Sequence, residues 1–331
     1  MKKKPVSKID EIIKDIQKQF DPEILFSLSD KSLKKIPAYS TGIFSIDDIL
    51  GIGGIPKGRV IEVFGPESQG KTTLALHMIA EIQKNGGLAA FIDAEHALDV
   101  NYAKNIGVDI EQMLIAQPDY GEQALDIVRT LIKTNKINVI VIDSVSALVP
   151  KEELEADSDK VTVALQARMM SKHMRQITSL LGKQSLTSVV FINQVRERVG
   201  VVWGNPEDTT GGRALKFYAS IRIDVRKRGQ SKRVVKKGDD PLAIKCHIRV
   251  VKNKVAPPFR ETDFEIIFGK GIDKISDTIN TAIRLKLIKK SGSFYLYKGE
   301  KIHGEAKLIK YFDNIVNYNK LRLRVLKSLK G

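Results

Sequence analysis

Phosphate chemistry is indicated first by one stretch of the sequence, Gly65-Pro66-Glu67-Ser68-Gln69-Gly70-Lys71-Thr72, which Thr73 follows. A glycine, four further residues and then Gly-Lys-Thr is the spacing of a phosphate-binding loop, and the flanks are typical of a strand and a helix. The glycines let backbone N–H groups point at phosphate oxygens, and the helix adds the positive end of its dipole. Lys71 is predicted to reach the β- and γ-phosphates of a nucleotide, and the Thr72 hydroxyl to bind Mg²⁺. The alternative is a glycine-rich turn that fits the pattern by chance.

Three more polar side chains follow apolar runs that are typical of buried strands: Glu95 after 88–93, Asp143 at the end of 137–143, and Gln194 after 189–193. Because the carboxyl ends of parallel strands meet at one edge of a sheet, we expect them beside the phosphate loop. There Glu95 suits the base that activates water, and Asp143 suits the acid that orients Mg²⁺ through its water shell. Gln194 is a neutral amide that could sense a γ-phosphate. For any one of them, capping a helix or filling a loop is the alternative.

Residues 195–213 contain four glycines and no clear period, and we interpret them as one long loop. The loop combines Arg196, Arg198 and Arg213 with the single tryptophan, Trp203. Guanidinium groups for phosphates and an aromatic wedge for bases suit single-stranded nucleic acid. An exposed surface loop with its tryptophan in the core is the alternative.

The elements that must position these residues alternate as strand, helix, strand, with helices near 122–134 and 164–182. This order predicts an α/β fold with a doubly wound, mostly parallel sheet. Before it, residues 6–20 have the apolar spacing of an amphipathic helix, and the residues alone favour packing on its own domain.

After the loop at 195–213, apolar and polar residues alternate in Ser220–Lys227 and Ala243–Val251, which predicts a hairpin that extends the sheet. Phe264–Phe268 is predicted to form a last strand. Residues 272–331 are predicted to form a small, strongly basic α+β module that could gather duplex DNA, although such charges are more often simply solvated. We therefore expect three parts, 1–36, 37–269 and 270–331.

Composition fits a globular protein with an acidic polymer as partner: 331 residues, 42% of them hydrophobic, and a net charge of +16. Solvated lysines without such a partner are the alternative. Cys246 is the only cysteine, so a disulfide within the chain and a cysteine-based metal site are excluded, and its alternating neighbours indicate a buried strand residue. No run has the length of a membrane span or a signal peptide, and we expect a cytoplasmic setting without membrane contact.

Several longer stretches resemble the bacterial RecA family over nearly the whole chain. They are 65–73, Phe91-Ile92-Asp93-Ala94-Glu95-His96-Ala97-Leu98-Asp99, Gln117-Pro118-Asp119, Phe191-Ile192-Asn193-Gln194, Gly204-Asn205-Pro206-Glu207, Thr209-Thr210-Gly211-Gly212, 214–220 and 250–254. A phosphate loop alone would indicate only a nucleotide binder.

The resemblance implies an ATPase with Mg²⁺ that forms helical filaments on single-stranded DNA and exchanges strands with a homologous duplex. It implies catalytic roles for Lys71, Glu95 and Gln194, adenine contacts from Asp99 and Tyr102, and a magnesium-side role for Asp143. Lys252 and Lys254 would reach the nucleotide of the adjacent subunit, like arginine fingers. Phe217 and the N-terminal helix would contact that neighbour, which reverses the interpretation from the residues alone.

For DNA, the resemblance implies backbone contacts from Arg168, Ser171, Arg175 and Arg196, and a second mobile loop at 195–209. Gly211, Gly212 and Arg213 border that loop. It also implies that the protein promotes self-cleavage of a repressor in the SOS response.

The chain departs from the family pattern at three places. Its first DNA loop reads Asp159-Lys160-Val161-Thr162-Val163-Ala164 instead of carrying a His-Met pair between glycines. Arg213 replaces a small amide, and the sequence stops at Leu329-Lys330-Gly331 without the acidic tail of many relatives. If such a tail repels duplex DNA, we expect readier duplex binding here.

Three other classes of protein share parts of this pattern. A P-loop kinase would act on a small molecule, a hexameric helicase would form closed rings, and a filament-forming binding protein would lack turnover. They differ in whether ATP turnover rises with single-stranded DNA and in the shape of the assembly.

Overall fold

The computed structural model describes residues 8–20, 25, 36–156, 164–182, 185–197, 207–230 and 242–330. The chain divides into two compact units, Met1–Ile36 and Pro37–Gly331. The first contains α1 (Lys8–Gln19), which confirms the predicted N-terminal helix. Ile9, Ile12 and Phe20 of this unit expose 59%, 60% and 57% of their surface.

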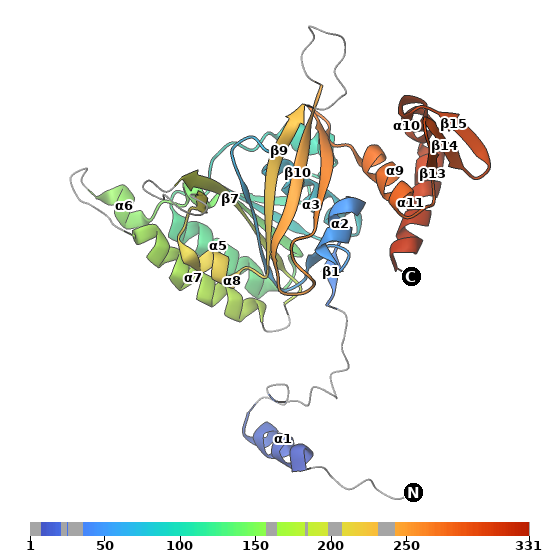
Figure 1. Cartoon of the computed structure of the whole chain (residues 1–331). Coiled ribbons are helices and arrows are strands. Elements are labelled where there is room, and N and C mark those ends of the chain that lie inside the picture. The colour runs from blue at the N-terminus through green and yellow to red at the C-terminus, as the bar shows by residue number, and fades with distance from the viewer. Residues whose placement is uncertain are drawn as a thin grey trace, which may run out of the picture. The chain divides into compact units, whose positions relative to one another are not determined.

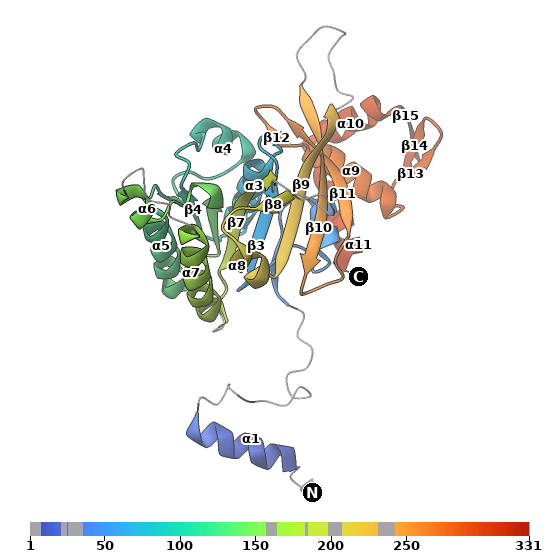
Figure 2. The ribbon, with the colours of Figure 1, turned by 60° about the vertical axis from the view of Figure 1, so that its left-hand side comes forward.

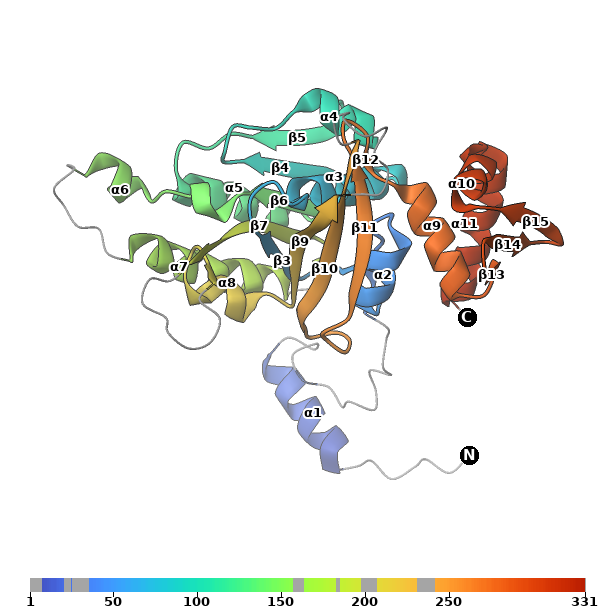
Figure 3. The ribbon, with the colours of Figure 1, turned by 45° about the horizontal axis from the view of Figure 1, so that its top comes forward.

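The second unit is built around a sheet that has ten strands within the described residues. Six neighbouring strands run parallel in the order β9-β3-β7-β6-β4-β5 (Figure 3). Their bounds are β9 Ile221–Gln230, β3 Val60–Gly65, β7 Ser188–Glu197, β6 Val139–Asp143, β4 Ala89–Asp93 and β5 Met113–Ala116. Every residue of β3, β4 and β6 is buried, as the continuous apolar runs predict for strands covered on both faces.

Helices cover both faces of this sheet, which confirms the doubly wound α/β fold (Figures 1 and 2). One apolar core includes residues of α2 (Phe44–Leu50), α3 (Lys71–Lys84) and α4 (Val100–Ile106). The other includes residues of α5 (Gly121–Thr134), α7 (Leu165–Leu181) and α8 (Arg213–Tyr218). The short elements are β1 Ala38–Tyr39, β2 Ile55–Pro56, a 3-10 turn at Val145–Ala147 and α6 Lys151–Glu155.

The predicted hairpin is confirmed and extends the sheet with antiparallel strands. β9 pairs with β10 (Ala243–Asn253), β10 with β11 (Glu261–Ile267), and β11 with β12 (Gly271–Ile272). Cys246 is fully buried on β10, as its alternating neighbours predict, and burial raises the pKa of its thiol to about 12. That thiol is therefore protonated at neutral pH.

The interpretation of 195–213 as one irregular loop is wrong at both ends. β7 continues to Glu197, and β8 (Glu207–Thr209) pairs antiparallel with it, Val195 opposite Thr209. Arg213 opens α8. Cross-strand pairing of two short polar segments has no signal in local periodicity, because the alternation that marks a strand is missing when both faces are polar. Residues 198–206 lie outside the described part of the chain.

A small α+β module ends the chain, and its apolar core also includes Phe44 of α2. Its elements are α9 Lys274–Arg284, β13 Lys289–Ser291, β14 Phe294–Tyr297, β15 Glu300–His303, α10 Glu305–Asp313 and α11 Ile315–Lys330. Asp277 of α9 accepts hydrogen bonds from the N–H groups of Phe44 (2.8 Å) and Ser45 (3.2 Å). It thereby satisfies the N-terminus of α2, which lacks a side-chain cap of its own. The division at 269/270 stays a prediction.

Two side chains of the phosphate-loop helix α3 contact this module and β12, the strand that precedes it. Glu81 forms an ion pair with Arg322 of α11 at 2.9 Å. His77, four residues earlier, accepts a hydrogen bond at Nε2 from the N–H of Ile272 (2.7 Å). Burial lowers the pKa of His77 from 6.5 to about 3, so the ring is neutral in the folded chain.

We expect acid to destabilise the fold through His77. As the pH falls below 6.5, His77 becomes protonated in the unfolded chain, whereas in the folded chain it stays neutral down to about pH 3. The free energy of unfolding should fall by up to about 1.4 kcal/mol per pH unit from this residue alone. In His77→Gln, whose side-chain carbonyl can still accept from Ile272, urea unfolding at pH 7.5 and 5.5 should show a smaller loss than wild type. His303→Gln, an exposed control, should lose as much as wild type; equal losses in both variants would contradict this role.

The described residues contain no helix that is both long and apolar enough to cross a bilayer.

Candidate functional site

The phosphate loop follows β3 directly and ends where α3 begins at Lys71. Gly65 and Gly70 have positive φ angles of 153° and 91°. A Cβ on Gly65 would collide with the carbonyl oxygen of Val225, and one on Gly70 with the Ile266 side chain. Each position therefore requires glycine for two reasons: the positive φ angle, and the close approach of β9 at Gly65 and of β11 at Gly70.

Lys71 is 7% exposed, and its Nζ donates to the carbonyl oxygen of Pro66 at 2.6 Å. Burial lowers the pKa of its ammonium group, while the charges of Asp143 and Glu95 oppose this shift. The side chain is thus held inside the loop, pointing at the loop's own backbone. A phosphate in the loop would offer stronger, charge-assisted acceptors at the same place.

Thr72 and Asp143 meet as a hydroxyl and a carboxylate, with Thr72 Oγ1 donating to Asp143 Oδ2 at 2.6 Å. Burial raises the pKa of Asp143 to about 6, although the hydrogen bond from Thr72 opposes this. Among the described side chains there is no group of three or more His, Cys, Asp or Glu that could hold a metal ion alone. One hydroxyl and one acid fit Mg²⁺, which keeps several waters and takes substrate phosphate oxygens as ligands.

Glu95 lies beside this pair and is held by two donors. Ser144 Oγ lies 2.5 Å and Gln194 Nε2 3.2 Å from its Oε1. Its side chain is exposed at the strand edge, where water can reach it. A carboxylate in this position can accept a proton from water, and the amide of Gln194 is in direct contact with it.

Strand register explains why these residues meet. Gly65 lies opposite Gln194 across β3 and β7, and Asp93 opposite Asp143 across β4 and β6. The four strands therefore end at one edge, and the predicted convergence is confirmed. The roles of the individual residues stay predictions.

Of the two residues predicted at the adenine, Asp99 immediately precedes α4 and Tyr102 lies on it. Asp99 caps the helix by accepting from the Tyr102 N–H at 2.9 Å, and the Tyr102 hydroxyl bonds Thr73 Oγ1 at 3.0 Å. Sequence reasoning missed a neighbour: Phe268, 51% exposed, precedes Gly269, whose carbonyl accepts from Asn105 of α4 at 3.1 Å. An exposed aromatic ring held near α4 could stack on a base, but nothing in its local sequence signals this.

Lys252 and Lys254 lie at the opposite end of β10 from Cys246, which contacts the phosphate loop. Lys252 Nζ donates to the carbonyl oxygens of Lys216 (2.6 Å) and Phe217 (3.0 Å), and Lys254 Nζ to that of Phe217 (3.3 Å). Phe217 itself is 71% exposed. The structure thus groups the three residues predicted at a subunit interface on one surface, apart from the phosphate loop of the same chain.

Three of the predicted DNA contacts lie on α7. Arg168, Ser171 and Arg175 share one helix face, at steps of three and four residues, with both arginines exposed. A Cβ on Gly212 would touch the Ala167 side chain, so the Gly211–Gly212 turn lies against the first turn of that helix. The exposed residues Arg196 and Arg213 lie on β7 and at the start of α8. Arg198 and Trp203 lie outside the described residues.

A buried polar network, missed in the sequence, links the strand that carries Gln194 to the end of the DNA loop. Glu62 is fully buried and binds Arg222 (2.5 Å) and Asn193 (2.9 Å). Asn193 in turn accepts from the Thr210 hydroxyl at 2.5 Å. Glu62 within an otherwise apolar strand is the one sequence signal, because a buried charge needs a partner.

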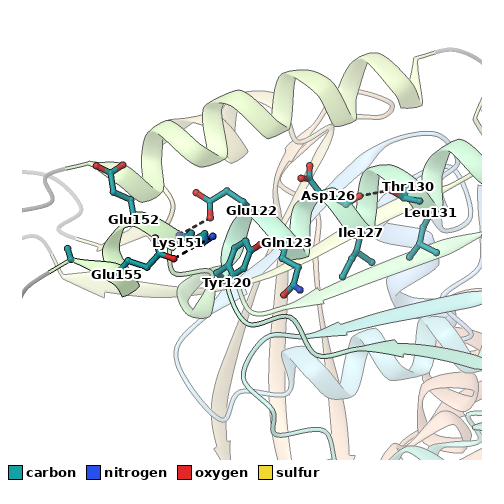
Figure 4. A pocket seen from close by; sticks show the side chains of 11 residues that line it. Tyr120, Glu122, Gln123, Asp126, Ile127, Thr130, Leu131, Lys151, Glu152 and Glu155 are labelled. Atoms are coloured by element: carbon teal, nitrogen blue, oxygen red, sulfur yellow. Dashed lines mark hydrogen bonds and ion pairs between the residues drawn. The ribbon is translucent and has the colours of Figure 1, made fainter.

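A cavity of about 960 Å³ lies away from the phosphate loop, along α5 and α6 (Figure 4). Tyr120, Ile127 and Leu131 give it apolar walls. Its acidic residues are Glu122, Asp126, Glu152 and Glu155. We call it the α5–α6 groove.

Comparison with known proteins gives consistent matches. A family model described as the RecA N-terminal domain matches residues 7–273. Protein RecA of Syntrophus aciditrophicus is 52% identical over 295 residues, covering 89% of this chain and 84% of that protein. Protein RecA of Thermus aquaticus is 52% identical over 299 residues (90% and 86%), and that of Desulforapulum autotrophicum 46% over 316 (95% and 90%).

Proposed function

This chain belongs to the RecA family of recombinases, and on that premise we propose that it is a DNA-dependent ATPase that assembles along single-stranded DNA. Mg²⁺ and ATP are its proposed cofactor and substrate, and a homologous duplex is the second DNA partner. One observation carries this proposal. Gln194 donates to Glu95 at the nucleotide edge and lies on β7, the strand that leads into the predicted DNA loop. A single strand therefore contacts both the proposed base and the proposed DNA site.

The proposed mechanism assigns a separate task to each residue. Lys71 exchanges the Pro66 carbonyl for phosphate oxygens, and Thr72 with Asp143 holds the magnesium side. Bound Mg²⁺ neutralises phosphate charge and orients the leaving group. Gln194 turns from Glu95 toward the γ-phosphate, which frees the Glu95 carboxylate to accept a proton from the attacking water. Lys252 and Lys254 of the adjacent subunit supply positive charge to the transferred phosphoryl group.

ATP turnover with and without single-stranded DNA tests the function. We expect turnover to rise at least tenfold, roughly 1.4 kcal/mol in the barrier, when a long single strand is added. A kinase acting on a small molecule would ignore the DNA, and a binding protein would show no turnover under either condition. Either outcome would remove the ATPase proposal.

For self-assembly, we propose that the α5–α6 groove receives α1 of a neighbouring copy. The groove offers apolar Ile127 and Leu131 between acids. α1 leaves Ile9 and Ile12 exposed, and the segment before it carries Lys2-Lys3-Lys4. Apolar faces and opposite charges thus complement each other.

Ile12→Glu should weaken assembly. Burial of an isoleucine contributes about 1.5–3 kcal/mol, so its loss should reduce the association constant roughly 10- to 150-fold. Sedimentation velocity without DNA measures this, and Gln19→Glu adds the same charge to the same helix as a control. If both variants assemble equally well, α1 does not occupy the groove.

A further inference from the structure

The phosphate loop contacts β9 as well as β7, the strand that bears Gln194. β3 and β9 pair as far as Phe64 opposite Asp224, and there β3 turns into the loop. Beyond this point the Lys227 N–H donates to Gln69 Oε1 of the loop, in a short hydrogen bond. Gln69 thus supplies the hydrogen-bond acceptor that a residue of β3 would provide if that strand continued beside Lys227. Its Nε2 also donates to the Glu67 carbonyl at 2.9 Å, which ties this contact to the loop's own shape.

Arg226 lies on β9 between Asp224 and Lys227, and its side chain binds Glu207, which borders the predicted second DNA loop. Arg226 binds Glu207 through both terminal nitrogens, Nη1 to Oε1 at 3.0 Å and Nη2 to Oε2 at 2.5 Å. Its Nε is held by Asp224 at 2.9 and 3.0 Å. Glu207 opens β8 and lies opposite Glu197 of β7, so it marks the base of the predicted second DNA loop.

The geometry of the Arg226–Glu207 pair fixes the orientation of one side chain relative to the other. A guanidinium and a carboxylate joined by two parallel hydrogen bonds keep a fixed relative orientation, which a lysine ammonium would not impose. Arg226 is 37% exposed and Glu207 26%, so solvent screening makes their effect on stability small. The hydrogen bonds from Arg226 hold the pKa of Glu207 below its usual range, so the pair stays charged at neutral pH.

We propose that Arg226 and Glu207 are positioning residues that couple the phosphate loop to the second DNA loop through β9. The backbone of Val225 lies against Gly65, and the N–H of Lys227 binds Gln69 of the phosphate loop. Arg226, between them, binds Glu207 at the border of the second DNA loop. A change of loop shape on nucleotide binding moves this short segment of β9 and, with it, Glu207. The connection is separate from Gln194, which acts through Glu95, and it rests on the proposed function.

Coupling between nucleotide and DNA binding tests the connection. The affinity for a fluorescent single-stranded oligonucleotide is measured with and without a non-hydrolysable ATP analogue, and the ratio of the two affinities is the coupling. In Arg226→Gln the ratio should fall at least fivefold, while analogue affinity without DNA stays within about twofold of wild type. The matched control is Arg228→Gln, on the same strand, because it removes the same charge from a 60% exposed arginine that binds Asp263 instead.

Two further variants keep the test decisive. Arg226→Lys retains the charge but loses the two-fold grip, and its ratio should fall as in Arg226→Gln; thermal unfolding verifies that each variant is folded. The exchanged pair Glu207→Arg with Arg226→Glu should recover part of the ratio. A wild-type ratio in Arg226→Gln, or equal losses in Arg226→Gln and Arg228→Gln, would overturn the connection. A wild-type chain whose DNA affinity ignores the analogue would instead overturn the proposed function, and the connection with it.

Discussion

Lys71→Ala is expected to lose nucleotide binding and DNA-dependent assembly together. Removing one partner of a buried, hydrogen-bonded charge pair costs about 2–5 kcal/mol, so nucleotide affinity should fall roughly 30- to several thousand-fold. Assembly should fail with it, because the proposed subunit contact includes the bound nucleotide. Equilibrium binding of a fluorescent ATP analogue measures the first effect, and light scattering with single-stranded DNA the second.

The same substitution should leave the fold intact. Burial of the Lys71 ammonium already opposes its charged form, and its hydrogen bond goes to the neutral carbonyl of Pro66, so alanine should not lower the unfolding temperature. Lys84→Ala, at the exposed far end of the same helix, controls for the lost charge and should bind nucleotide like wild type. Unchanged nucleotide affinity in Lys71→Ala would contradict the phosphate-loop assignment.

Glu95→Gln is expected to separate binding from turnover. The amide keeps the size of the side chain and can still accept from Ser144, but it cannot take a proton from water. General-base catalysis contributes about 10²–10⁴-fold, so the DNA-dependent turnover number should fall by that factor. ATP and DNA affinities should stay within a few-fold of wild type. Single-turnover hydrolysis with excess enzyme measures the chemical step directly.

Two outcomes would change the assignment at Glu95. Retained turnover would remove Glu95 from the role of base. Lost DNA binding would instead make it a structural partner of Gln194, since the two side chains are 3.2 Å apart. Glu111→Gln is a matched control, because Glu111 is an exposed acid outside the phosphate loop and should leave turnover unchanged.

The sequence predicts well which residues meet at the sheet edge beside the phosphate loop, because the signals for them are local. A phosphate loop needs glycines at fixed spacing, and buried parallel strands need continuous apolar runs, so Lys71, Thr72, Glu95, Asp143 and Gln194 can be placed together from one-dimensional patterns. The register that places Gly65 opposite Gln194 is seen only in the structure.

Long-range polar contacts could not be predicted in this way. Asp277 caps α2 by a hydrogen bond to Ser45, which is 232 residues away in the sequence. Arg226 of β9 binds Glu207 of β8. No sequence spacing indicates either pairing. β8 was missed for the same reason, since its pairing depends on β7 and not on its own three residues. The partners of polar residues outside a motif depend on the tertiary fold and cannot be read from local sequence.

Electron microscopy with long single-stranded DNA and a non-hydrolysable ATP analogue tests the central claim most directly, namely that the nucleotide site is completed by a second copy of the chain on DNA. We predict extended right-handed helical filaments that require both DNA and analogue, and that are absent for Lys71→Ala. Closed rings, or isolated particles under the same conditions, would contradict it.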